Sequence, residues 1–114
     1  MATGRSEILQ GTLDLMVLQT LVAMGPMHGY GLARRIEQMS EDALLVNQGT
    51  IYLCLIRLVQ KRLIKAEWGT SENNRKAKYY SITKAGRKQL AAETENWERI
   101  SRVIGRLLLL GDRR

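Results

Sequence analysis

Residues 47–83 read NQGTIYLCLIRLVQKRLIKAEWGTSENNRKAKYYSIT, and along this stretch the apolar residues change from a helical period to an alternating one. The first part predicts a helix that begins at a cap on Asn47 or Gln48 and ends near Arg62. Its inward stripe consists of Ile51, Cys54, Leu55 and Leu58. On this stripe Cys54 is expected to be a small buried hydrophobe and not a redox sensor.

A β-hairpin is expected directly after this helix. Ile64–Trp68 alternates between apolar and polar residues, as a half-buried strand does, and Tyr79–Ile82 is a second strand candidate. The polar turn between them contains Asn73 and Asn74, which favour a hairpin loop. The two strands with the basic tip between them are interpreted as a wing. We expect Trp68, where the wing begins, to be a core anchor.

Two helices are expected before Asn47. The first is Leu9–Met24, which ends at Gly25 and Pro26. One of its faces carries Leu13, Val17, Leu21 and Met24. A second apolar face carries Leu15, Leu18 and Val22. Because a helix that is apolar on two faces needs two burial partners, we expect the second face to contact another subunit.

The second helix follows His28, which we interpret as its capping residue. Its inward residues are expected to be Ala33, Ile36 and Met39. Tyr30 is expected to lie in the core rather than on a DNA-binding surface. A short extended piece, Leu44–Val46, leads from this helix to the third.

The last helix is capped by Thr83 and is too long for the rest of the chain to cover. Its apolar seam consists of Trp97, Ile100, Ile104 and Leu107. These residues recur at alternating spacings of three and four, as in a coiled coil. We therefore expect a second copy of the chain to pack on this seam.

The fold class that follows is mainly α with a small β-hairpin. Three helices and a two-stranded hairpin form a winged helix-turn-helix domain, which we assign to residues 8–82. A long C-terminal dimerisation helix occupies residues 83–110, and the two parts are expected to form one structural unit.

The positive charge is concentrated in one part of the chain. The net charge is +7, and ten of the 18 Lys and Arg residues lie between Arg57 and Lys88, where only Glu67 and Glu72 are acidic. A local basic block on a folded domain indicates a polyanionic partner such as nucleic acid. The alternative is a solvated face that keeps the protein in solution.

Several classes of function are disfavoured by composition. No apolar run is long enough for a membrane span, and Asp14 interrupts the first apolar stretch, so we expect no signal peptide and a cytoplasmic location. One histidine and one cysteine are too few for a usual zinc site. The chain has no Gly-rich phosphate loop and no nucleophile–base grouping, so neither a cofactor nor an enzymatic activity is expected.

Candidate DNA contacts lie on the third helix. Tyr52 could donate a hydrogen bond to a phosphate oxygen, and the alternative is a core tyrosine. Gln48, Thr50 and Arg57 could reach base edges in the major groove. The alternative for Arg57 is a salt bridge on a solvated face.

Further candidate contacts lie in the wing. Lys76 and Lys78 fall on one side of the pleat, which suits two contacts to a single DNA backbone strand. Arg75 lies at the hairpin tip and could enter a narrow minor groove, where the negative potential is strongest.

The ordered set of motifs resembles the PadR-like transcriptional regulators. The motifs are LDL at 13–15, GP at 25–26, HGYG at 28–31, GTIY at 49–52, RL at 57–58, RKAKYY at 75–80, IT at 82–83, and Gly86. The resemblance covers roughly residues 9–108. The compact length of the chain is similar to that of the shorter subfamily, which has a single C-terminal helix. It implies a dimeric DNA-binding regulator, typically a repressor, with the third helix in the major groove of double-stranded DNA.

The chain departs from the family pattern at three places. Leu53 stands where the family usually has proline, Ile56 where a polar residue is common, and Arg62-Leu63 where a glycine closes the helix. Leu53 is expected to face outward among the candidate DNA contacts. The resemblance also implies that Trp97 could pair across the dimer and stack a flat aromatic effector. The alternative is that Trp97 packs into the partner and binds nothing.

Two other functions remain open from the sequence. One is a winged-helix module that binds proteins and no DNA, which the basic wing argues against. The other is a small-molecule sensor or carrier without DNA binding, for which Leu53 leaves room. A titration with nonspecific DNA separates the first of these from a DNA-binding regulator.

Overall fold

The computed structural model describes residues 6–7 and 10–112. Its elements in chain order are β1 Ser6–Glu7, α1 Gln10–Met24, β2 Met27–His28, α2 Gly29–Met39, β3 Leu44–Leu45, α3 Gln48–Gln60, β4 Ile64–Thr70, β5 Lys76–Ile82 and α4 Lys84–Asp112. The predicted class, mainly helical with a small β-hairpin and a long last helix, is confirmed. Ile8 and Leu9, where we expected the domain and the first helix to begin, lie outside the described residues.

Helices α1, α2 and α3 enclose a single core. Its main residues are Leu13, Val17, Leu18, Leu21, Leu32, Ala33, Ile36, Ile51, Cys54, Leu55, Leu58, Ile64 and Tyr80. The inward stripe predicted for the third helix is buried throughout. Two expected inward positions are wrong, because Met24 and Met39 are the last residues of α1 and α2, where each helix has passed beyond the core, and both are exposed.

The caps expected for α2 and α3 are present. His28 Nδ1 accepts a hydrogen bond from the backbone N–H of Gly31 at 3.0 Å. At the start of α3 the residue that serves is Asn47, whose Oδ1 accepts from the N–H of Thr50 at 2.7 Å. Each bond satisfies a donor that the first turn of a helix leaves unpaired.

The wing is the antiparallel hairpin of β4 and β5. Its register places Trp68 opposite Lys78 and Thr70 opposite Lys76, so the strands reach further outward than the sequence indicated. At the tip, Asn74 has φ 61°, a left-handed conformation that asparagine tolerates well. The two-residue strand β2 joins the other side of β5, which gives the order β2-β5-β4. The pairing of β1 with β3 was also not predicted.

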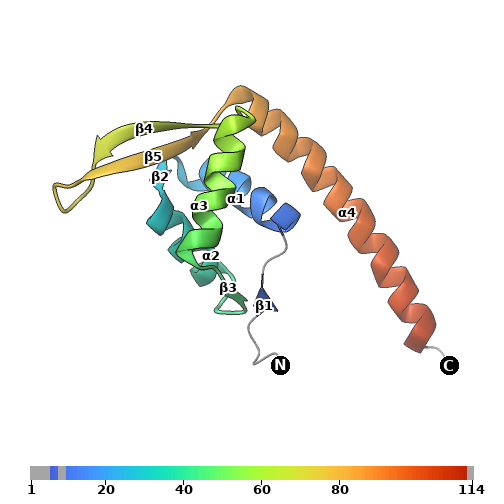
Figure 1. Ribbon diagram of the computed structural model, residues 1–114. Coiled ribbons are helices and arrows are strands. Elements are labelled where there is room, and N and C mark those ends of the chain that lie inside the picture. Colours follow the sequence, from blue (N-terminus) through green and yellow to red (C-terminus); the bar gives the residue numbers. More distant parts are fainter. Residues whose placement is uncertain (1–5, 8–9, 113–114) are drawn as a thin grey trace.

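The long helix α4 begins against the end of α3. The hydroxyl of Thr83 accepts a hydrogen bond from the N–H of Gly86 at 3.0 Å and donates to the Arg62 carbonyl at 2.8 Å. A Cβ at Gly86 would overlap the carbonyl oxygen of Leu63, so this close approach requires glycine. From there α4 runs away from the helical body, while the wing projects from the opposite side (Figure 1). The assignment of 8–82 and 83–110 as one structural unit stays a prediction.

Candidate nucleic-acid interface

The first turns of α3 combine a buried and an exposed face. The buried stripe packs on α1 and α2, and its spacing leaves Thr50 and Leu53 on the opposite, exposed side. Leu53 is 62% exposed, so its expected outward orientation is confirmed. This exposed side is the part of α3 that a DNA duplex can reach.

Arg57 is held against α1. Its Nη2 donates to Oδ1 of Asp14 at 2.6 Å, and this hydrogen bond is the main cause that raises the pKa of Arg57 above its ordinary value. The salt bridge considered as the alternative for Arg57 is therefore present. Arg57 is not among the residues that gather with Gln48 and Tyr52 beside the wing.

Cys54 shares the same carboxylate. Its Sγ lies 3.1 Å from Oδ1 of Asp14, to which the thiol donates. Burial raises the pKa of Cys54 to about 12, and the hydrogen bond and the negative charge of Asp14 act in the same direction. The thiol is therefore protonated at neutral pH, as expected for a buried and unreactive cysteine.

The cationic side chains of the wing are accessible to solvent. Arg75, Lys76 and Lys78 are all exposed, and the Nζ of Lys78 lies 5.5 Å from the centroid of the Trp68 ring. The expectation that Trp68 anchors the core is wrong, because its side chain is 67% exposed. The reason is that β4 continues beyond the helical body to Thr70, so the outer half of the hairpin has no core beneath it.

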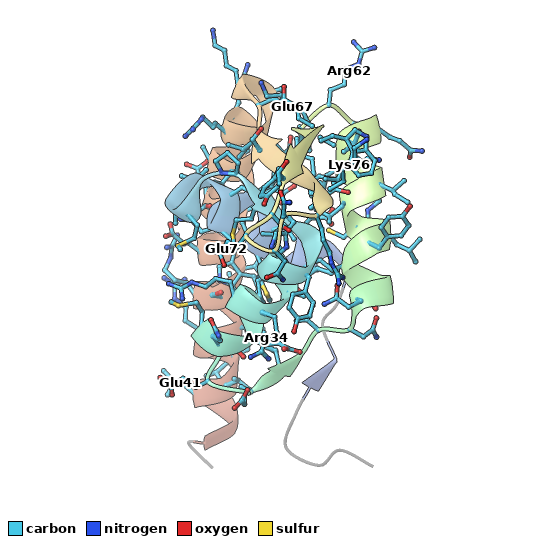
Figure 2. The ribbon with its side chains drawn as sticks, turned by 90° about the vertical axis from the view of Figure 1, so that its left-hand side faces the viewer. Arg34, Glu41, Arg62, Glu67, Glu72 and Lys76 are labelled. Atoms are coloured by element: carbon cyan, nitrogen blue, oxygen red, sulfur yellow. The ribbon has the colours of Figure 1, made fainter. Side chains whose placement is uncertain are left out.

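A groove of about 460 Å³, which we call the α3–wing groove, lies between α3 and the hairpin. Its polar lining includes Gln48 and Tyr52 from α3, Tyr30 from α2, and Asn73, Arg75, Lys76, Lys78 and Tyr80 from the wing. None of its lining residues is acidic. Figure 2 looks onto the wing side, where Lys76 lies near α3 and Glu72 lies away from it. Glu72 lines a different groove, beside Pro26 and His28.

Tyrosines contribute much of the surface around this groove. Tyr52 is exposed, so its alternative interpretation as a core residue does not apply. The expectation that Tyr30 is a core residue is wrong: it is 60% exposed and lines the α3–wing groove. Tyr80 is buried behind them, and this burial raises the pKa of its hydroxyl. Tyr30 was missed because its helical position alone does not distinguish a core from a groove residue.

The residues expected at a dimer interface are only partly available on the surface. Leu18 is 0% exposed and belongs to the protomer's own core, so its assignment to an interface is corrected. Leu15 and Val22 are half-buried. The seam of α4 is exposed along its length, through Trp97, Ile100, Ile104 and Leu107.

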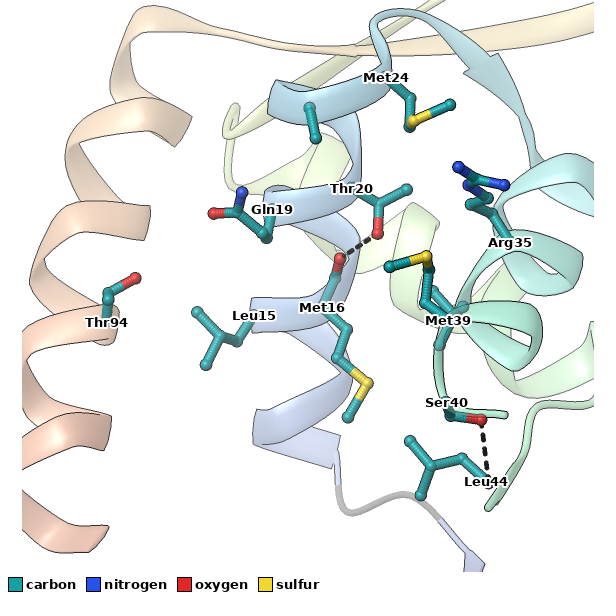
Figure 3. Close-up of a pocket in the computed structure, with 12 residues that line it drawn as sticks. Leu15, Met16, Gln19, Thr20, Met24, Arg35, Met39, Ser40, Leu44 and Thr94 are labelled. Atoms are coloured by element: carbon teal, nitrogen blue, oxygen red, sulfur yellow. Dashed lines mark hydrogen bonds between the residues drawn. The ribbon is translucent and has the colours of Figure 1, made fainter. Parts of the chain in front are cut away.

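A second groove, which is mainly apolar, lies on the side of the molecule that α4 overhangs. It measures about 590 Å³ and runs between α1 and α2, with Thr94 of α4 at its edge (Figure 3). Leu15, Met16 and Met24 line it from α1, and Met39 lines it from α2. This groove contains the exposed methionines that the sequence had suggested for the core.

A helix-turn-helix followed by a basic hairpin, with one face of the third helix left open, defines the winged-helix class of transcriptional regulators. The family model described as "Transcriptional regulator PadR-like family" matches residues 17–92, so the chain belongs to the PadR-like family of transcriptional regulators. Members of this family are regulatory DNA-binding proteins, and the prediction that the chain is not an enzyme is thereby confirmed.

Solved structures of PadR regulators agree with this membership, and the chain also has an uncharacterised relative. A PadR-like transcriptional regulator of Bacillus cereus has a TM-score of 0.76 and 29% identity, with 88% of this chain and 94% of that chain covered. A PadR family regulator of Clostridium difficile has a TM-score of 0.75 and 29% identity, over 86% and 99%. "Uncharacterized protein X" of Lysinibacillus sphaericus is 29% identical over 88% of this chain and 91% of its own length. In the described part of the chain, no helix is long and apolar enough to cross a membrane.

Proposed function

We propose that this chain is a homodimeric repressor that binds a specific operator, with α3 in the major groove and the wing on the adjacent backbone. The observation that carries the proposal is the α3–wing groove, in which Tyr52, Lys76 and Lys78 face a common space that no carboxylate lines. A surface of hydroxyls and cations matches the phosphate oxygens of a duplex.

These residues have two different roles in the proposed complex. Tyr52, Arg75, Lys76 and Lys78 hold the DNA backbone, and such contacts fix register without reading sequence. Gln48 and Thr50, at the start of α3, reach base edges, where an amide can pair with adenine. Arg57 has no base-reading role in this arrangement, since its guanidinium is bound to Asp14.

The homodimer is proposed from the two apolar surfaces of the protomer. The seam of α4 and the apolar groove between α1 and α2 both lack a cover within the described chain. A second copy would place its own α4 against them, and Leu15 would then contribute to the interface. The two α3 helices must sit about one helical turn of DNA apart, roughly 34 Å, to read two half-sites.

An effector site at Trp97 is a separate part of the proposal. Trp97 is 50% exposed on α4, which leaves an indole face available near the proposed two-fold axis. In a dimer it either stacks a flat aromatic ligand or packs into the partner and binds nothing. Quenching of Trp97 fluorescence by planar aromatic cations, lost in Trp97→Phe, supports the first arrangement, and its absence supports the second.

The proposed function is tested by selecting bound DNA from a random pool with the purified protein. We expect enrichment of a site with two-fold symmetry whose half-sites are about one turn apart. Weak binding of all sequences without enrichment would argue against an operator. A protein that binds no duplex at low salt would favour the protein-interaction module instead. Because a regulator of this kind acts on chromosomal DNA, we place it in the cytoplasm.

A further inference from the structure

The exposed face of α3 carries no free charge. Arg57 is the one charged residue between Gln48 and Gln60, and its guanidinium is bound to Asp14 at 2.6 Å. The usual readout of guanine, a bidentate contact from Arg or Lys, is therefore not provided by this helix. Whatever α3 reads in a major groove must be recognised by amide, hydroxyl or apolar groups.

Two aliphatic side chains occupy the centre of that face. Leu53 is 62% exposed and Ile56 is 37% exposed. They are three residues apart, so they are neighbours on the helix surface, and Leu53 lies opposite the buried stripe. A branched aliphatic side chain exposed on a recognition surface loses the stabilisation of burial unless a partner covers it.

The positive charge of the neighbouring segments indicates what covers this pair. Lys61 and Arg62 are exposed beyond the end of α3, and Arg75, Lys76 and Lys78 are exposed on the wing. A second copy of the chain would bring the same cations to the patch, and the two positive rims would repel each other. A polyanion with apolar groups on its surface fits both these cations and the apolar pair of Leu53 and Ile56.

We propose that Leu53 and Ile56 contact the C5-methyl groups of thymines and thereby select thymine at defined positions of each half-site. The thymine methyl is the apolar group that base pairs present in the major groove, where aliphatic side chains contact it. This inference rests on the proposed function, because it requires α3 to enter a major groove.

The test removes the methyl groups from the DNA. In an operator obtained by selection, each thymine of the half-sites is replaced in turn by deoxyuridine, which keeps base pairing and loses only the methyl. Binding is measured by fluorescence anisotropy of labelled duplexes. At the contacted positions we expect affinity to fall about fourfold per half-site, the factor for exposing one buried methyl group.

Protein variants show whether these two residues cause the effect. The double variant L53A/I56A should bind thymine and deoxyuridine operators with affinities within about twofold of each other, because the methyl has lost its partner. Leu53→Ala alone, at a mainly exposed site, provides the same comparison if the double variant folds poorly. Gln60→Ala, one turn further along the same exposed side, should keep the full sensitivity to deoxyuridine.

The outcomes separate this inference from the proposed function. Tight operator binding that is unchanged by deoxyuridine at every position would overturn the role of Leu53 and Ile56 and leave the repressor intact. Loss of the dimer in L53A/I56A would also overturn it, because the patch would then be a contact between protomers. A wild-type protein that binds no DNA would overturn the proposed function and this inference together.

Discussion

Arg57 of α3 and Asp14 of α1 form a hydrogen-bonded ion pair, 2.6 Å from Nη2 to Oδ1, between residues 43 positions apart in the chain. Both side chains are largely shielded from solvent. The pair ties the helix proposed to read DNA to the helix that lines the apolar groove. The same carboxylate accepts a hydrogen bond from the thiol of Cys54, so two side chains depend on Asp14.

We expect Asp14→Asn to destabilise the fold by about 2 kcal/mol, because it leaves a shielded guanidinium without its anion. Urea unfolding followed by circular dichroism measures the change. The matched control is Arg34→Ala, which breaks the more exposed Arg34–Glu37 pair, 3.6 Å apart, and should cost under about 1 kcal/mol. Equal losses of stability in the two variants would show that the Asp14–Arg57 pair stabilises the fold no more than the exposed Arg34–Glu37 pair does.

Cys54 should remain unreactive in the folded protein. With a folded pKa of about 12 and an ordinary value of 9.0, the native state keeps a proton that the unfolded chain has lost between these pH values. The contribution of Cys54 to the free energy of unfolding is complete below pH 9. Above pH 9 this contribution declines by about 1.4 kcal/mol per pH unit. We therefore expect stability to fall more steeply in wild type than in Cys54→Ala over this range. Rapid labelling of the native thiol at pH 8 would contradict the account.

Arg62 ends α3 in a left-handed conformation that destabilises the fold. The N–H of Leu63 bonds to the Leu58 carbonyl and that of Arg62 to the Val59 carbonyl, with Arg62 at φ 62°. This is the helix ending in which glycine is preferred, because a side chain strains the left-handed conformation. We expect Arg62→Gly to raise the free energy of unfolding by about 0.5–1 kcal/mol after the entropy cost of glycine. Arg62→Ala keeps a Cβ and should give no such gain.

The seam of α4 should govern oligomeric state. Replacing Ile104 and Leu107 with glutamate places charges on the exposed apolar face, and we expect monomers or unfolded chains. Arg102→Glu, away from the seam on the same helix, is the control and should stay dimeric. Light scattering at micromolar concentration decides between them, and a well-folded wild-type monomer would remove the dimer from the proposal.

Local patterns in the sequence were sufficient to predict most of the architecture. The stripe of α3, the caps at His28 and Thr83, and the turn at Asn73 and Asn74 all depend on residues close together in the chain, and each is found in the structure. The strand β2 was missed because its pairing of Met27 with Tyr80 joins residues far apart in the sequence.

The errors at the site have two physical causes. Trp68 and Met39 are large and apolar enough for a core, yet each lies where its element has passed the edge of the packed body. Tyr30 lies near the start of α2 and is exposed at the α3–wing groove. How far a strand or helix extends beyond its neighbours is set by tertiary packing and not by local spacing. For Arg57 the residues gave the two possible roles, but only the fold brings Asp14 to its side.

The wing offers the most direct test of DNA recognition. Lys76 and Lys78 are exposed on one face of the hairpin, beside Tyr52 in the α3–wing groove. Replacing both with alanine should weaken binding to operator and random DNA by similar factors, because phosphate contacts carry no sequence information. Gln48→Ala on α3 should instead weaken operator binding selectively, by about 1–3 kcal/mol per lost base contact.

The decisive measurement is the slope of log affinity against log salt concentration for wild type and for the variant K76A/K78A. Each phosphate contact that is lost should flatten the slope by about 0.9 on duplex DNA. We expect a shallower slope and weaker binding for the variant on both operator and random DNA. A folded variant whose affinity and slope equal those of wild type would show that the wing does not touch DNA.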